Sequence, residues 1–259
     1  VNKIVDKEGV KIMGESNTNL KLRVIPVILV HNMQIVKSRG FSDYRVVGNL
    51  EQTIEVFNRR KVDEIIVLDI GASKGNLGVN LNILKLISRN TLMPLSYGGG
   101  ITSLKDIERC LSSGCDKVII NCQAFSNRKL IKDAVDAFGS QAIVASVDYK
   151  LVDKEYKIYN HVEHDVHQSN FVDYINNILS AGVGELVLSS VDADGKLSGY
   201  DIGILDCLPE MNIPILINGG CGAPIHMKNA FKNKISGCCA GSIFYFTEYG
   251  YRDIKEYLT

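Results

Sequence analysis

Residues 93–101 read MPLSYGGGI, and residues 213–221 read IPILINGGC, 120 positions further along the chain. A second pair, DEIIVLD at 63–69 and GELVLSS at 184–190, is offset by 121 positions. Each segment is an apolar run that ends in small or polar residues, as a buried strand followed by a turn does. Two matched pairs at nearly the same offset indicate an internal repeat of about 120 residues rather than a chance similarity of apolar strands.

Short apolar runs rich in β-forming residues recur through the whole chain, and polar or amphipathic stretches separate most of them. Because the runs do not alternate with polar residues, they suit a parallel sheet whose outer face is covered. Eight strands alternating with helices at this length favour a closed (β/α)8 TIM barrel, here made of two half-barrel repeats, over an open doubly wound sheet. The predicted strands are Val24–Val30, Ile65–Leu68, Pro94–Tyr97, Val118–Ile120, Ala142–Val147, Leu186–Leu188, Ile213–Ile217 and Ile235–Ala240, and helices are predicted at Leu50–Arg59, Leu104–Leu111, Asn127–Phe138 and Phe171–Ala181.

The composition limits the class of protein. The 259 residues include 29 basic and 29 acidic side chains, a balance that argues against a nucleic-acid partner bound through a basic face. No apolar run reaches the roughly 18 residues that a membrane span needs. The seven cysteines include no CxxC pair and several lie in apolar runs, which predicts a cytoplasmic protein without a disulfide framework. We expect one barrel domain at 21–259 after an N-terminal extension at 1–20 that lacks the apolar core of a signal peptide.

In a (β/α)8 barrel the residues that follow the strands meet at one rim, and active sites form there. Asp148 follows the fifth predicted strand as a lone carboxylate, so it is the best acid/base candidate, with a turn-capping role as the alternative. The equivalent position in the other half-repeat is Leu29, 119 residues earlier. Asp69 and Asn218 end two further predicted strands and belong to the same mouth.

Glycines at the same rim predict two phosphate sites, because backbone N–H groups in a glycine-rich turn bind anions without a charged side chain. The repeat relates the two sites, so they suit a ligand with a phosphate at each end. The alternative is that the glycines only make tight turns. One site comprises Gly99, Gly100, Asn121 and Cys122, the other comprises Gly219, Gly220, Gly241 and Ser242, and Asp194 and Gly195 are further phosphate-binding candidates.

Charged residues also stand at the starts of four predicted strands, on the opposite rim. They are Arg23, Glu64, Lys117 and Glu185. A single charge at a strand start is usually solvated, but two of each sign could close an ion-paired ring over the barrel floor.

Three histidines and an aspartate lie within HVEHDVH at 161–167. Their spacing matches no standard metal site, so we interpret the segment as a solvated loop and expect neither a metal nor a cofactor.

The motifs together resemble the cyclase subunit of imidazole glycerol phosphate synthase, the HisF family. The resemblance runs from about Leu22 to the C-terminus through segments such as LRVIPVILV, GCDKVIINCQAF and GVGELVLSSVDADGKLSGYD. It implies a two-phosphate barrel that works as a heterodimer with a HisH-like glutaminase. Ammonia made by that partner would enter at the floor, where the resemblance assigns the gate to the four charged residues and places Asp116 facing the glutaminase. It also implies a place for Lys37 at the mouth.

One departure from the family stands out. The family uses two catalytic aspartates, at the ends of the first and fifth strands, and here only Asp148 is present because the first position is Leu29. Loss of an acid/base group typically lowers a rate by about 10²–10⁴-fold. Cys122 stands where a threonine is usual in the first phosphate loop, and a thiol is a weaker donor. The first strand, IPVILVHN, is more similar to a divergent, WbuZ-like branch associated with glycosyl amidation.

The intact floor charges together with Leu29 favour the first of three functions, and the other two are alternatives. The first is a barrel subunit that receives ammonia for amidation, by acetamidino formation, of a bacterial surface-glycan sugar, with a downstream amidotransferase and with cyclase activity lost. The second is a cyclase of histidine biosynthesis that converts ammonia and an aminoimidazole ribonucleotide precursor into imidazole glycerol phosphate. The third is a non-catalytic subunit that activates its glutaminase partner.

Overall fold

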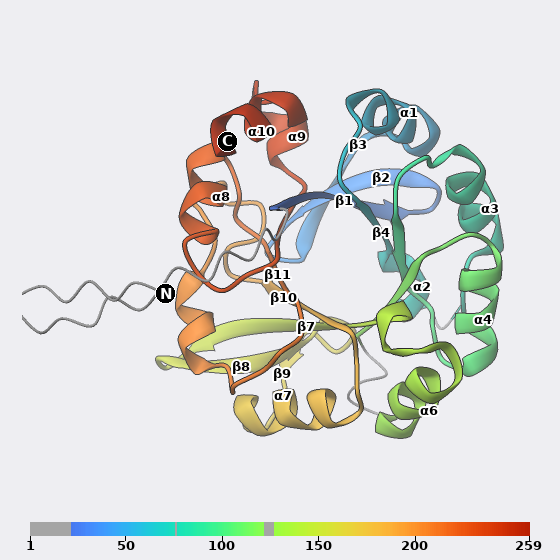
Figure 1. The fold of residues 1–259 in the computed structure, drawn as a ribbon, viewed down its shortest axis with the longest axis vertical. Coiled ribbons are helices and arrows are strands. Elements are labelled where there is room, and N and C mark those ends of the chain that lie inside the picture. Colours follow the sequence, from blue (N-terminus) through green and yellow to red (C-terminus); the bar gives the residue numbers. More distant parts are fainter. Residues whose placement is uncertain (1–21, 76, 122–126) are drawn as a thin grey trace, which may run out of the picture.

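The computed structural model describes residues 22–75, 77–121 and 127–259, and its centre is a closed barrel of eight parallel strands. Around the barrel the order is β1, β4, β5, β6, β7, β10, β11 and β12, after which β12 pairs with β1 (Figure 1). The predicted (β/α)8 architecture is thereby confirmed. The strands are β1 Arg23–His31, β4 Ile65–Asp69, β5 Leu95–Gly98, β6 Lys117–Ile120, β7 Ile143–Val152, β10 Glu185–Ser190, β11 Ile215–Asn218 and β12 Gly237–Ala240.

Helices surround the barrel as an outer ring (Figure 1). The four helices predicted from the sequence are present, each within one residue of its predicted ends. Asparagine side chains begin several of them; for example, Asn49 accepts hydrogen bonds from the backbone N–H groups of Glu51 and Gln52. The helices are α1 Leu50–Arg60, α2 Ile70–Lys74, α3 Leu81–Asn90, α4 Leu104–Ser112, α6 Arg128–Phe138, α7 Phe171–Ser180, α8 Pro224–Ala230, α9 Ile243–Phe246 and α10 Tyr251–Leu258, with 3₁₀ turns at η1 Ser140–Ala142 and η2 Ile202–Cys207.

The strands bury both of their faces, which explains why their sequences do not alternate. On β1, Val24, Ile28 and Val30 pack outward under the helices. Ile25 and Val27 point inward, where they join an apolar cluster that fills the barrel. The remaining members of this inner cluster are Ile66, Ile119, Val144, Val187, Leu216 and Cys239, with Leu29 and Leu68 packed against it.

Each half-barrel begins with a strand that continues into an antiparallel hairpin beyond the mouth. β1 pairs with β2 (Gln34–Arg39), which pairs with β3 (Ser42–Asn49). In the second half, β7 pairs with β8 (Glu155–Asn160), which pairs with β9 (Asp165–Val166). The two hairpins meet where the Phe41 and Tyr159 rings pack edge to face, with centroids 6.4 Å apart.

The glycines of the repeat are also equivalent in structure. Gly100 and Gly220 both have positive φ angles, +69° and +94°. A Cβ at Gly100 would lie 2.2 Å from the carbonyl oxygen of Gly78, and a Cβ at Gly220 would lie 2.0 Å from that of Gly199. Both the dihedral angle and the close backbone approach therefore require glycine at these positions.

The predicted N-terminal extension at 1–20 lies outside the described residues. The cysteines in the described part of the chain are free thiols, and most are buried. Among the described helices, none has the length and apolar character to cross a membrane.

Candidate active site

A cavity opens at the mouth, and every predicted mouth residue that the structure describes lines it. Its polar and glycine lining includes Lys37, Asp69, Gly99, Gly100, Asn121, Asp148, Asp194, Gly195, Asn218, Gly219, Gly220, Gly241 and Ser242. Cys122 lies outside the described residues. The fold thus gathers strand ends that are up to about two hundred residues apart in sequence into one site.

Asp148 sits at the end of the parallel part of β7 and is only 4% exposed. Its Oδ2 accepts a hydrogen bond from Asn121 Nδ2 at 2.8 Å and lies 2.8 Å from Nδ1 of His161. The sequence predicted a lone carboxylate here, whereas the structure gives it two hydrogen-bonding neighbours. It is held by an amide and an imidazole, and Asn121 Oδ1 is buried with no hydrogen-bond partner among the described residues.

The position of His161 corrects the interpretation of 161–167 as a solvated loop for that residue, whereas residues 162–165 are exposed as expected. The β7–β8 turn has positive φ at Asp153 and Lys154, the pattern of a two-residue hairpin turn. The ladder pairs Tyr149 with Ile158, so the returning chain passes back over the end of β7 and carries His161 into the cavity. His164 is exposed, and the described residues contain no group of three metal-binding side chains. Two features of the sequence could have revealed this hairpin: the turn residues Asp153 and Lys154, and the alternation of polar and apolar residues in EYKIYN at 155–160.

Leu29 lies across the mouth from Asp148, because β1 and β7 are four strands apart in a barrel of eight. Its side chain lines the cavity and packs with Leu68 on the inner cluster. The aliphatic group predicted for this position therefore points into the site.

Lys37 brings a buried cation to the second glycine site. Its Nζ donates a 2.8 Å hydrogen bond to the carbonyl oxygen of Val27 and lies 4.9 Å from the centre of the Tyr245 ring. A Cβ at Gly241 would approach this Nζ to 2.2 Å, so glycine makes room for it. Burial lowers the pKa of Lys37 to about 8, although Asp194 acts in the opposite direction.

This pKa predicts a pH-dependent anion site. We expect sulfate to bind more weakly as the pH rises through about 8, because Lys37 then loses its proton while sulfate keeps its charge. Isothermal titration calorimetry from about pH 6.5 to 9.5 measures the affinity, and the Lys37→Met variant should bind weakly with a flat profile. Equal affinity of the unmodified protein at both ends of that range would contradict a contribution from Lys37.

Asp194 and Gly195, predicted to bind phosphate, line the cavity and also contact or closely approach the β2–β3 hairpin. Asp194 Oδ2 accepts hydrogen bonds from Ser38 Oγ at 2.7 Å and from the backbone N–H of Phe41 at 3.2 Å. A Cβ at Gly195 would lie 2.5 Å from the carbonyl oxygen of Ser38. An ionised carboxylate only accepts hydrogen bonds and repels phosphate, so fastening the hairpin is the role that the geometry supports. Burial raises the pKa of Asp194, while these two hydrogen bonds act to lower it.

Two other predicted mouth residues also have structural partners. Asp69 Oδ1 accepts a hydrogen bond from the backbone N–H of Gly71 at 3.2 Å, at the start of α2. Asn218 Nδ2 donates to Ser189 Oγ at 3.2 Å on the neighbouring strand. Both residues still line the cavity.

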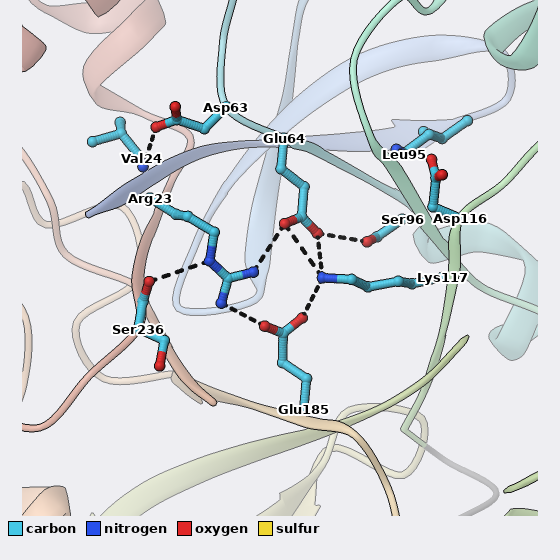
Figure 2. A network of polar contacts seen from close by, with 10 residues as sticks. All are labelled: Arg23, Val24, Asp63, Glu64, Leu95, Ser96, Asp116, Lys117, Glu185 and Ser236. Atoms are coloured by element: carbon cyan, nitrogen blue, oxygen red, sulfur yellow. Dashed lines mark hydrogen bonds and ion pairs between the residues drawn. The ribbon is translucent and has the colours of Figure 1, made fainter. Parts of the chain in front are cut away.

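At the opposite end of the barrel, the four predicted charges point toward one another (Figure 2). Arg23 contacts Glu64 at 3.1 Å and Glu185 at 2.6 Å. Lys117 contacts the same two carboxylates at 3.1 and 2.8 Å. The result is a closed ring of alternating charge, called here the floor ring, to which Ser96 Oγ adds a hydrogen bond to Glu64.

The ion pairs of the floor ring offset the free-energy cost of burying its charged side chains. Burial alone would lower the pKa of Arg23, but Glu185 and Glu64 outweigh it and raise the pKa. Lys117 follows the same balance, with Glu64 and Glu185 raising its pKa against burial. Beside the ring, Asp116 is exposed and its carboxylate accepts a hydrogen bond from the backbone N–H of Leu95 at 2.8 Å.

Comparison with known proteins now assigns the family. The family model described as histidine biosynthesis protein matches residues 23–250. A Campylobacter jejuni protein, provisionally named imidazole glycerol phosphate synthase subunit hisF2, is 37% identical over 92% of this chain and 96% of its own. Proteins named imidazole glycerol phosphate synthase subunit HisF from Natranaerobius thermophilus and Hydrogenobaculum are 34% and 36% identical, over 93% and 92% of this chain and 96% of each of theirs. Together with the barrel and its two polar ends, these matches show that the chain belongs to the HisF family of histidine biosynthesis proteins.

Proposed function

We propose that this chain is a cyclase-type subunit of an imidazole glycerol phosphate synthase. It would take ammonia from a HisH-like glutaminase at the floor and use it at the mouth on an aminoimidazole ribonucleotide precursor with two phosphates. The observation that carries the proposal is the pairing of an intact floor ring with a mouth that combines Asp148 and two glycine sites. The names of the relatives favour this function over the amidation of a glycan sugar.

The floor offers features suited to a protein partner. Asp116 is exposed beside the floor ring, and Leu92, in the loop that leads into β5, has 86% of its surface exposed. These are groups that a glutaminase docked over the floor would cover. The ring itself lies on the barrel axis, where a molecule released by that partner would enter (Figure 2).

The interior between floor and mouth suits a neutral molecule. The inner cluster that fills it is apolar, with Ile25, Val187 and Cys239 among its members. Moving an ion through such surroundings costs far more than moving a neutral polar molecule. Ammonia, rather than ammonium, is therefore the form that this core would pass.

Leu29 is the observation that favours the second candidate, a barrel that has lost cyclase activity and supplies ammonia for amidation elsewhere. An aliphatic side chain neither transfers a proton nor binds a charged group, and Leu29 occupies the place of the family's first-strand aspartate. The loss of this carboxylate matters less if another titratable group at the mouth transfers the proton.

The test uses the purified protein with an ammonium salt and the aminoimidazole ribonucleotide precursor, with imidazole glycerol phosphate as the measured product. We expect measurable turnover, and we expect Leu29→Asp to change it by less than about tenfold, well below the contribution of an essential acid/base group. No turnover by the unmodified protein, followed by a large gain in Leu29→Asp, would contradict the proposal and favour a lost activity.

The third candidate, a non-catalytic activator, is distinguished by blocking the core. A bulky substitution at Val187 should leave activation of the glutaminase intact but stop its ammonia from supporting turnover at the mouth. Activation without any delivery of ammonia in the unmodified complex would favour the activator instead.

A further inference from the structure

We propose that His161 and Asp148 form a proton-transfer pair, with His161 as the group that exchanges protons with the ligand and Asp148 as its positioning partner. This inference rests on the proposed function, which it deepens. It places the proton-exchanging imidazole and the carboxylate that orients it on one side of the mouth, whereas the family pattern places two carboxylates on opposite sides.

The first argument is geometric. His161 Nδ1 lies 2.8 Å from Asp148 Oδ2, and the two side chains are 22% and 5% exposed. A carboxylate accepts hydrogen bonds, so the short contact places a proton on Nδ1 and leaves Nε2 with the lone pair. The same carboxylate oxygen is held from the barrel wall by Asn121 Nδ2. An imidazole oriented through Nδ1 by a fixed carboxylate is the arrangement that general bases use in many enzymes.

The second argument is the location of the pair. Both residues line the mouth cavity, as Leu29 does on the far side. His161 is delivered there by the β7–β8 hairpin, whose backbone ladder fixes the approach of the returning strand. The site thus lacks a titratable group where the family has its first aspartate, and it has an additional one beside the second.

The proton balance of the step is simple. When ammonia forms a bond to a ligand carbon through its lone pair, its nitrogen becomes positively charged and gives up a proton. His161 Nε2 accepts that proton, and the neighbouring carboxylate stabilises the resulting imidazolium. As the bond between that carbon and the ligand nitrogen that it already carried breaks, this nitrogen keeps the bonding pair and takes the proton back from the ring. It leaves as a neutral amine, and the pair ends in its starting state.

The test has a spectroscopic part that does not depend on the reaction. The chain has five histidines, so ¹⁵N labelling of histidine gives few signals, and His161→Gln identifies the one that belongs to His161. We expect the neutral ring to carry its proton on Nδ1 in the unmodified protein, and Asp148→Ala, which removes the acceptor, to release the ring into a mixture of both tautomers. A mixture in the unmodified protein, or no effect of Asp148→Ala, would overturn the pair whatever the activity.

The kinetic part uses the ammonium-dependent assay. We expect His161→Gln to lower kcat about 10²-fold with KM unchanged, as for loss of a general base. His164→Gln is the matched control, because His164 is in the same turn and exposed, and it should keep full activity. An unchanged kcat in His161→Gln overturns the catalytic part of the proposal. If the unmodified protein does not turn over this precursor, the proposed function fails, and the tautomer measurement alone then supports or overturns the pair.

Discussion

Asp148→Asn is expected to lower ammonium-dependent turnover by about 10²-fold, as His161→Gln does, because the carboxylate acts through the imidazole that it orients. The carboxylate is nearly inaccessible and interacts with both Asn121 and His161. The amide keeps the size of the side chain but loses the charge that orients the imidazole and stabilises its protonated form. Steady-state kinetics with the purified variant measure the effect.

The control for Asp148→Asn is the stability of the fold, measured by urea denaturation. Asparagine still offers an oxygen to one of the two neighbours, so we expect a change of about 1–2 kcal/mol in the free energy of unfolding, far from loss of the native state. Turnover within tenfold of that of the unmodified protein would show that the chemistry of the mouth does not use this carboxylate.

Glu64→Gln is expected to lower the free energy of unfolding by about 3 kcal/mol. Glu64 is buried, contacts both cations of the floor ring and accepts from Ser96. Its neutralisation leaves Arg23 and Lys117 to share Glu185, so one positive charge in the ring has no counter-charge. The figure lies at the low end of the range for broken buried pairs because the two cations are 21% exposed and keep part of their hydration.

Two variants give this prediction its controls. Glu55→Gln removes a carboxylate from the exposed ion pair with Arg59 on α1, so it should cost less than about 1 kcal/mol. Glu64→Gln combined with Lys117→Met removes one charge of each sign, so the pair of changes should cost less than the sum of the two single ones. A cost for Glu64→Gln no greater than that of Glu55→Gln would mean that the floor ring adds nothing to stability.

Substitutions at the mouth and in the floor ring are expected to differ in whether they change turnover or the free energy of unfolding. Asp148→Asn is expected to affect mainly turnover, with a smaller loss of stability than Glu64→Gln causes. The reason lies in the partners that remain. The asparagine at position 148 can still accept a hydrogen bond from a neighbour, whereas the floor ring depends on its alternating charges. Measuring both quantities for both variants separates a catalytic role from a structural one.

The sequence by itself determined the barrel, the half-barrel repeat and the inward aliphatic group at Leu29. These features depend on local patterns: apolar strands ending in glycines, helical spacing between them, and an offset near 120 residues that returns the same pattern. It also identified the charges of the floor, because each stands at the start of a strand and parallel strands begin at the same end of a barrel. The residue types and the order of the strands were sufficient to place these charges at one end of the barrel.

Only the tertiary structure decided which side chains meet. It placed His161 against Asp148 and fastened the β2–β3 hairpin to Asp194, and it gave each floor cation two carboxylate partners. Hairpin registers and contacts across the barrel depend on where the chain returns after a turn, which residue type alone does not encode. The character of the mouth therefore follows from long-range packing, because the groups that define it come from opposite ends of hairpins and from strands far apart in sequence.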